Sequence, residues 1–170
     1  MRPLKIFLGH GASGGVESIR PHVEGLRARG FEAGAVALPI RRAEAAVKNF
    51  LDTSGEGAGI VVGGHSYGGR VASLAAARHR FAALLCFSYP LHPPGRPEKM
   101  RTEHLVEIRC PALFLSGDAD QFAQIDRLRD AVDAMHQARL LVFKGESHGI
   151  RGALDQALDA SADFLRGLQP

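Results

Sequence analysis

The sequence predicts an α/β protein in which helices cover both faces of a parallel sheet, as a three-layer αβα sandwich. Six short runs rich in aliphatic residues recur along the chain. They are continuously apolar and not alternating, which is typical of strands that are buried on both faces. Segments with helical periodicity separate most of these runs, so strand and helix alternate almost throughout. The runs are residues 4–8, 33–38, 59–62, 82–87, 112–116 and 139–143.

In each predicted helical segment, the apolar residues lie on one face. These faces are Val16, Ile19, Val23 and Leu26; Ala46, Val47, Phe50 and Leu51; Ile125, Leu128, Val132 and Met135; and Leu154, Ala157, Leu158, Leu165 and Leu168. One connection breaks the alternation, because residues 88–97 contain four prolines and favour an extended loop. This loop leaves the carboxyl end of a predicted strand, where open α/β sheets bind ligands. It either covers a site or forms a rigid surface connector.

Length and composition indicate one globular domain, residues 1–170, without a membrane span. Hydrophobic residues make up 45% and charged residues 23%, as in ordinary globular proteins. No apolar run approaches the roughly 20 residues that cross a bilayer, and no signal-peptide cleavage site follows the first strand. A cytoplasmic protein is therefore expected. The net charge of +3 comes from scattered Lys and Arg, which argues against a nucleic-acid partner.

The cysteines and histidines do not predict a disulfide or a metal site. Cys86 and Cys110 lie near opposite ends of consecutive predicted strands, so both are expected to be buried free thiols. The eight histidines are dispersed, without the spacing of metal ligands. No metal or other cofactor is expected.

The strongest local signal is a strand that runs into Gly64-His65-Ser66-Tyr67-Gly68 and then directly into a helix of small residues. A turn this sharp strains the serine backbone, and glycines two residues away on each side let neighbouring segments pass closely. The turn exposes the Ser66 hydroxyl at a helix N-terminus, which favours developing negative charge. Ser66 is therefore the candidate nucleophile.

A serine nucleophile needs a base and a group that orients the base. His148, in Gly145-Glu146-Ser147-His148-Gly149 after the last predicted strand, is the candidate base. Asp118 and Asp120 both follow the strand at 112–116 and compete for the orienting role, and Glu146 is a more remote alternative. All of these residues follow the carboxyl ends of strands, so we expect them at one edge of the sheet.

The loop after the first strand, residues 8–15, is expected to complete an oxyanion hole. The backbone N–H of Tyr67 is one candidate donor, and the N–H of Ala12, or next that of Ser13, is the other. The same loop formally matches the G-x-G-x-x-G pattern of dinucleotide sites at Gly9, Gly11 and Gly14. Because no acidic residue closes the second predicted strand, a nicotinamide enzyme is disfavoured.

Taken together, these motifs resemble the α/β-hydrolase superfamily over almost the whole chain. The matching segments are His10-Gly11-Ala12, residues 64–70, Gly117-x-x-Asp120 and Ser147-His148. Residues 88–97 and 101–105 resemble a group of compact hydrolases related to dienelactone hydrolase. The resemblance implies that Asp120, third after the glycine, is the acid. It also implies a minimal fold that lacks the first two strands and the cap domain, with six strands in the order 2-1-3-4-5-6.

The predicted function is hydrolysis of a small-molecule carboxylic ester or thioester, in the manner of a carboxylesterase or thioesterase. Dienelactone hydrolase is similar but uses a cysteine nucleophile, so its lactone specificity is not expected of Ser66. Two alternatives stay open: a non-catalytic protein that docks partners on the same fold, and an acyltransferase that uses the same residues. The oligomeric state and the physiological substrate are not predicted. The candidate substrate contacts are His10, Ser13, Tyr89, Leu91, His92 and Phe122.

Overall fold

A computed structural model of the protein describes residues 3–168 and shows a six-stranded, fully parallel sheet. The strand order is β2-β1-β3-β4-β5-β6, as the resemblance implied. Each predicted apolar run lies on a strand, with ends that differ by a few residues. The strands are β1 (Lys5–Gly9), β2 (Glu32–Val36), β3 (Gly57–His65), β4 (Phe81–Phe87), β5 (Ala112–Gly117) and β6 (Ala138–Phe143).

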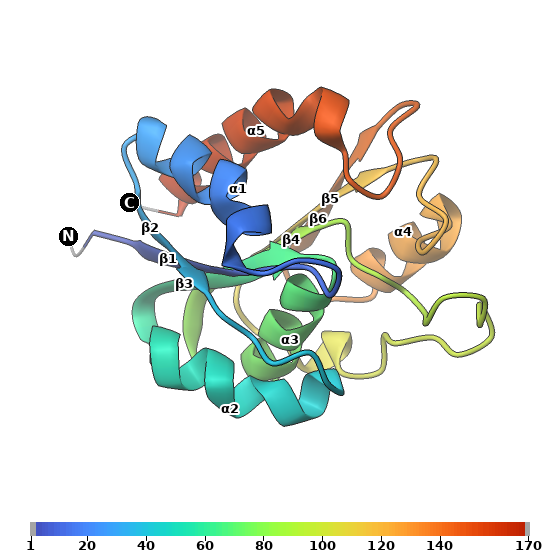
Figure 1. Ribbon diagram of the computed structural model, residues 1–170, viewed down its shortest axis with the longest axis horizontal. Helices are drawn as coiled ribbons and strands as arrows, with labels where there is room; N and C mark the ends of the chain where they lie inside the picture. The colour runs from blue at the N-terminus through green and yellow to red at the C-terminus, as the bar shows by residue number, and fades with distance from the viewer. Residues whose placement is uncertain (1–2, 169–170) are drawn as a thin grey trace.

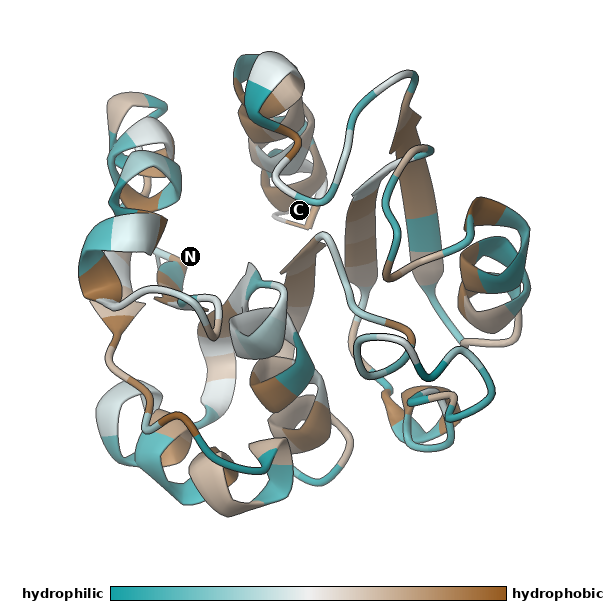
Figure 2. Ribbon diagram, turned by 45° about the vertical axis from the view of Figure 1, so that its right-hand side comes forward, coloured by the Kyte–Doolittle hydropathy of each residue, from teal (hydrophilic) through white to brown (hydrophobic). Residues whose placement is uncertain are grey.

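Within residues 3–168, five α-helices cover the two faces of the sheet and complete the predicted three layers (Figure 1). They are α1 (Val16–Ala28), α2 (Ala43–Ser54), α3 (Tyr67–Ala76), α4 (Ile125–Asp133) and α5 (Leu154–Gly167). Helices α1 and α5 share one hydrophobic core with the sheet, and α2, α3 and α4 share the core on the other face. The central strands are hydrophobic on both faces because both are covered (Figure 2).

Two apolar faces differ from their prediction at one end. Val16 is 38% exposed at the start of α1, where the helix extends past the edge of the core. His22 is buried on the same face, beside Ile19, Val23 and Leu26. Met135 lies beyond the end of α4, although its side chain is still buried. Periodicity thus locates the buried face but not the last turn that contacts the core.

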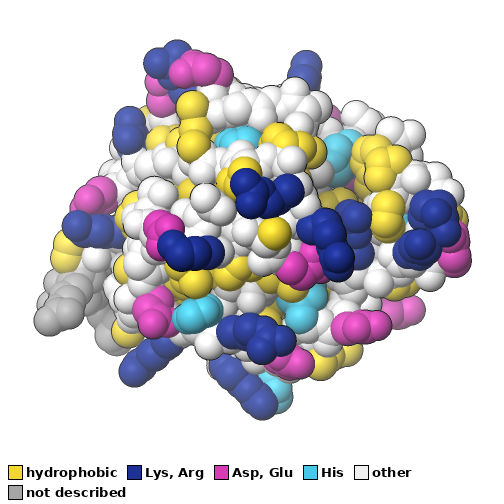
Figure 3. Space-filling model, turned by 60° about the horizontal axis from the view of Figure 1, so that its bottom comes forward, with side chains coloured by type: hydrophobic (Ala, Val, Ile, Leu, Met, Phe, Trp, Pro, Cys, Tyr) yellow, Lys and Arg dark blue, Asp and Glu magenta, His cyan; other side chains and the backbone are white. Residues whose placement is uncertain are grey.

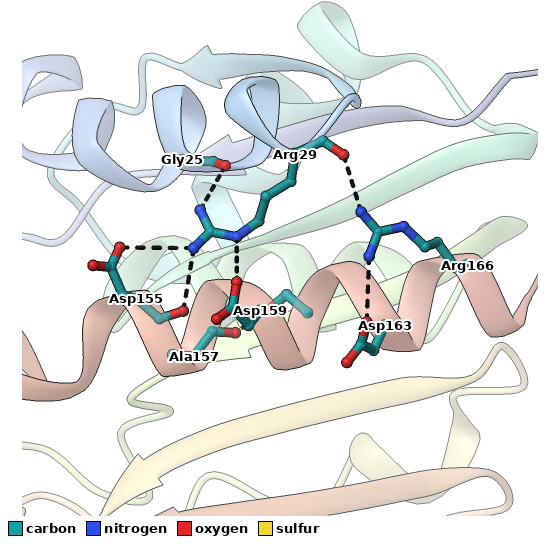
Figure 4. Close-up of polar contacts among 8 residues, drawn as sticks. Gly25, Arg29, Asp155, Ala157, Asp159, Asp163 and Arg166 are labelled. Carbon is teal, nitrogen blue, oxygen red and sulfur yellow. Dashed lines mark hydrogen bonds and ion pairs between the residues drawn. The ribbon is translucent and has the colours of Figure 1, made fainter.

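Hydrogen bonds and ion pairs connect α5 to the end of α1 (Figure 4). Arg29 donates from Nε to Asp159 at 2.8 Å and from Nη1 to the carbonyl oxygen of Gly25 at 2.9 Å. Arg166 donates to the Arg29 carbonyl oxygen at 3.2 Å and pairs with Asp163. The Arg29 side chain is only 20% exposed, so its contacts are better shielded than an ordinary surface ion pair. These contacts position α5 and hence the loop that precedes it.

His22 makes folding stability depend on pH. Burial and, to a smaller extent, the neighbouring His65 lower the pKa of His22 to about 4. Neither ring nitrogen has a hydrogen-bond partner within residues 3–168. The unfolded chain therefore binds the proton more tightly than the folded protein between about pH 6.5 and 4. The stabilisation is complete above this window and is lost as pH falls through it.

We expect the free energy of unfolding to fall by on the order of 2–3 kcal/mol from this group between pH 7.5 and pH 4. Urea denaturation of wild type and His22→Leu at both pH values measures it, and the variant should lose less stability on acidification. His136→Gln, which changes an exposed histidine, is the matched control. An unchanged pH dependence in His22→Leu would contradict this origin.

The proline-rich loop and the cysteines complete the fold. Residues 88–92 are buried, whereas residues 94–99 are exposed. Both cysteines are free thiols, as expected, but only Cys86 is buried and Cys110 is half-buried. Among the helices of residues 3–168, none combines the length and the apolar character that a bilayer crossing requires.

Candidate active site

Ser66 occupies the sharp turn between β3 and α3. Its backbone has φ 50° and ψ −115°, a conformation that a residue with a side chain rarely adopts. The Ser66 N–H donates to the carbonyl oxygen of Phe87 at 2.9 Å, and the Ser66 carbonyl accepts the N–H of Arg70 at 3.0 Å. These bonds hold the strained residue between the end of β4 and the first turn of α3.

The two flanking glycines are needed because backbone segments pass in direct contact. A Cβ atom on Gly64 would overlap the carbonyl oxygen of Gly9 and the backbone of Gly68. A Cβ atom on Gly68 would in turn overlap the carbonyl group of Gly9. The end of β1 and the start of α3 therefore leave no space for a side chain at either position. This is the close approach that the G-x-S-x-G pattern predicted.

Hydrogen bonds join the side chains of Ser66, His148 and Asp120. His148 Nδ1 lies 2.7 Å from Asp120 Oδ2, and His148 Nε2 lies 2.8 Å from Ser66 Oγ. Because a carboxylate only accepts, the Nδ1 atom carries the proton and Nε2 presents its lone pair to the serine hydroxyl. The three residues come from loops after β3, β5 and β6, at the carboxyl edge of the sheet.

The structure also separates the competing acidic residues. The Asp120 side chain is fully buried, and its second oxygen accepts the N–H of Phe122 at 2.8 Å. Asp118 is exposed and accepts the N–H of Gly145 at 2.7 Å, which ties the β5 loop to the loop that carries His148. Glu146 accepts the N–H of Gly152. Of these three acidic residues, Asp120 is the one that contacts the imidazole of His148.

His65, which the sequence reasoning did not single out, supports the His148 loop. Its Nε2 lies 3.1 Å from the carbonyl oxygen of His148, so Nε2 donates to that oxygen. Burial lowers the pKa of His65, although the carbonyl contact opposes the shift. Its ring packs between His22 and His148, at centroid distances of 6.0 and 5.3 Å. Its position immediately before the serine was the only sequence signal for this role.

The loop proposed to hold an oxyanion lies next to Ser66. Strands β1 and β3 are neighbours, and Gly9 pairs in register with Gly64. The loop after β1 therefore starts beside the serine turn. Ala12 and Ser13 are exposed in this loop, and Tyr67 begins α3 directly after Ser66. Their backbone N–H groups remain the predicted donors.

The six candidate substrate contacts occupy different environments. Phe122 is half-buried and contacts His148 edge to face, with the ring centroids 4.7 Å apart, and Ser13 is exposed. The structure does not bring the other four to the exposed side of the site: His10, Tyr89, Leu91 and His92 are all buried.

Internal hydrogen bonds explain three of these buried positions. His10 Nε2 accepts the N–H of Leu38 at 3.0 Å, and its Nδ1 contacts the carbonyl oxygen of Gly11. Tyr89 donates to the carbonyl oxygen of Arg101, and His92 Nδ1 contacts that of Pro93.

The site combines a strained serine with an imidazole that is held in place. Within residues 3–168, no three His, Cys, Asp or Glu side chains are grouped closely enough to hold a metal ion. A strained serine at a helix N-terminus, bonded to an oriented imidazole, is equipped for nucleophilic attack on a carbonyl carbon.

Comparison with known proteins agrees with this architecture. Est1E from Butyrivibrio proteoclasticus with ferulic acid bound superposes with a TM-score of 0.81 at 19% identity, covering 98% of this chain and 89% of that one. One of the metagenome-derived lipolytic enzymes LipS and LipT gives 0.80 at 14% identity, covering 96% and 94%. Dienelactone hydrolase from Anabaena variabilis gives 0.76 at 17% identity, covering 97% and 86%.

The family comparison extends over most of the chain. Residues 37–163 match the family model described as an alpha/beta hydrolase domain. The matched range contains the serine turn, the β5 loop with Asp120 and the loop that carries His148. The chain therefore belongs to the α/β-hydrolase family and has structural relatives that include dienelactone hydrolase.

Proposed function

We propose that the protein is a serine hydrolase that cleaves a carboxylic ester or thioester through an acyl-enzyme. The observation that carries the proposal is the continuous chain of hydrogen bonds from Ser66 through His148 to the buried Asp120. It has the order and the tautomer that a Ser-His-Asp triad requires. The solved structures of similar fold include proteins described as lipolytic enzymes and as a dienelactone hydrolase, which favours the same chemistry.

In the proposed first half-reaction, Ser66 Oγ attacks the substrate carbonyl carbon while His148 Nε2 takes the hydroxyl proton. Asp120 stabilises the resulting imidazolium and keeps its ring in place. The tetrahedral intermediate then collapses, and His148 returns the proton to the leaving alcohol or thiol. In the second half-reaction, His148 deprotonates a water molecule that attacks the acyl-enzyme, which releases the carboxylic acid and regenerates Ser66.

The negative oxygen of each tetrahedral intermediate needs preorganised donors. We assign this role to the backbone N–H groups of Tyr67 and Ala12, with Ser13 as the second candidate for the latter. Tyr67 lies in the first turn of α3, where N–H groups lack helical partners. Exposed Ser13 and half-buried Phe122 are the remaining candidates for contact with the substrate.

Labelling with a fluorophosphonate probe tests the proposal directly. The probe phosphonylates serines that a neighbouring base activates, so wild type should be labelled and Ser66→Ala should not. Ser18→Ala is the matched control, because Ser18 lies on α1 and its hydroxyl donates to the carbonyl oxygen of Gly15. Intact-mass spectrometry reads the result. Folded wild type that stays unlabelled would count against the hydrolase and in favour of a non-catalytic docking protein.

A further inference from the structure

A cavity of about 330 Å³ opens beside the first turn of α3, on the face of the protein that α2 and α3 cover. Its size is within the range of small-molecule sites. In the space-filling view of this side, several Lys and Arg side chains gather on the surface, with acidic side chains between them (Figure 3). The charged residues that line it are Arg41, Arg42, Glu44, Arg70, Lys99 and Arg101.

The lining of the cavity carries a larger positive charge than the protein as a whole. It contains five cationic side chains and one acidic side chain, whereas the formal net charge of the whole chain is only +3. Within residues 3–168, neither Arg41, Lys99 nor Arg101 has an ion-pair partner. Like charges this close repel one another unless an anion joins them, so the unpaired excess favours an anionic ligand.

The one acidic side chain that lines the cavity, Glu44, shows that a carboxylate is stabilised beside these cations. Glu44 accepts a hydrogen bond from Arg70 Nη2 at 3.0 Å. Its pKa is lowered by its own backbone N–H and by the nearby cations, of which Arg70 acts most strongly. Arg70 is only 9% exposed, and its Nη1 has no hydrogen-bond partner within the described part of the chain. A buried guanidinium with an unused donor leaves binding capacity that one carboxylate does not satisfy.

The remaining cations lie on the segments that frame the cavity. Arg101 follows the proline-rich loop, which Tyr89 fixes by donating to the Arg101 carbonyl oxygen at 2.7 Å. Burial lowers the pKa of Arg101, and the charge of Arg70 acts in the same direction. Both arginines line the same cavity. The proline-rich loop contributes Pro93 to this cavity, and the segment after the loop contributes Lys99, Met100 and Arg101.

The cavity is close to the proposed nucleophile. Tyr67 lines it and directly follows Ser66, and its hydroxyl donates to the carbonyl oxygen of Pro39 at 2.7 Å. Arg70 follows Ser66 by four residues on the same helix, which corresponds to about 6 Å along the helix axis. The cavity therefore borders the turn that carries Ser66.

We propose that this cavity binds an anionic group of the substrate, a carboxylate or a phosphate, so that the enzyme selects esters or thioesters that carry a negative charge away from the scissile bond. This inference rests on the proposed serine hydrolase activity and specifies its substrate class. Arg41, Lys99 and Arg101 supply the unpaired charge, and Arg70 supplies buried donors.

Paired ester substrates test the selectivity. The mono-4-nitrophenyl ester of glutaric acid carries a terminal carboxylate, and 4-nitrophenyl valerate is a neutral analogue of similar length. We expect wild type to show a kcat/KM at least about tenfold higher for the anionic ester, the factor that one charge-assisted contact supplies. The preference should decrease as salt screens the charges. Arg101→Gln should remove most of the preference by raising KM for the anionic ester only.

Arg96→Gln is the matched control, because Arg96 lies on the same loop but pairs with Glu98 and does not line the cavity. It should keep the wild-type preference. Equal kcat/KM for the two esters in wild type would overturn the anion site, yet Ser66-dependent cleavage of the neutral ester would leave the hydrolase proposal standing.

A binding measurement decides the anion site even if neither ester is cleaved. Inorganic phosphate, titrated calorimetrically into wild type and Ser66→Ala, should bind both proteins with the same affinity. Arg101→Gln should bind it about tenfold more weakly, whereas Arg96→Gln should match wild type. Absence of saturable phosphate binding by folded wild type would overturn the inference.

Discussion

Replacement of Ser66 by alanine is expected to lower kcat for ester hydrolysis by about 10⁶-fold, and His148→Ala should cost about the same. Ser66 Oγ and His148 Nε2 lie 2.8 Å apart, so either change removes one member of the proposed proton-transferring pair. For the same reason, the variant that combines Ser66→Ala and His148→Ala should have a kcat within a small factor of either single variant. The loss corresponds to about 8 kcal/mol of transition-state stabilisation.

Initial rates on 4-nitrophenyl esters measure this loss, with every variant assayed at the same protein concentration by mass. His79→Ala controls for removal of a histidine, because His79 lies between α3 and β4 and contacts Glu56 at the opposite edge of the sheet. Circular dichroism and thermal unfolding check that each variant folds. A Ser66→Ala protein that keeps a tenth of the wild-type rate, free of contaminating esterase, would remove Ser66 from the nucleophile role.

Asp120→Asn is expected to lower kcat by about 10⁴-fold while the protein stays folded. Both oxygens of Asp120 accept hydrogen bonds, one from His148 and one from the N–H of Phe122. An asparagine that keeps the Phe122 contact turns its NH₂ group toward Nδ1 of His148. The imidazole then carries its proton on Nε2 and cannot take the proton of Ser66.

Asp118→Asn provides the matched comparison two residues away. Asp118 accepts the N–H of Gly145, and the amide oxygen of asparagine preserves that contact. We expect its kcat to stay within tenfold of wild type. Steady-state kinetics of both variants separate the two assignments. A slow Asp118→Asn beside a nearly normal Asp120→Asn would reverse the roles of the two acids.

Much of the fold could be predicted because burial on both faces leaves a continuous apolar signal. The runs at 82–87 and 112–116 became the fully covered strands β4 and β5, with boundaries shifted by at most one residue. The run at 59–62 was too short, since β3 extends over Gly57–His65 and its glycines carry no hydrophobic signal. Val16 shows the limit of helical periodicity, which cannot indicate where a helix extends past the sheet.

The positions of the site residues were predictable where a residue lies in the loop after a strand. Ser66, Asp120 and His148 each follow a strand of the parallel sheet, and such positions converge on one edge whatever their separation in sequence. The supporting roles of His65 and His10 were not predictable, because their partners are the backbone carbonyl of His148 and the N–H of Leu38. Every residue has a backbone carbonyl, and nearly every residue has an N–H, so the residue type of the partner does not indicate such a contact.

The order of the strands followed from the resemblance to the α/β hydrolases. The sequence by itself determined which segments form strands, that these strands run parallel, the sharp turn at Ser66, and the edge of the sheet where Ser66, Asp120 and His148 lie. These features depend on local sterics and on which segments must be buried. Only the tertiary structure decided that Asp120 and not Asp118 contacts His148 by geometry, that Tyr89 and Leu91 are buried, and that Arg41, Arg70 and Arg101 share one cavity. Side-chain contacts between distant segments depend on how the loops pack, and no spacing rule along the chain encodes that packing.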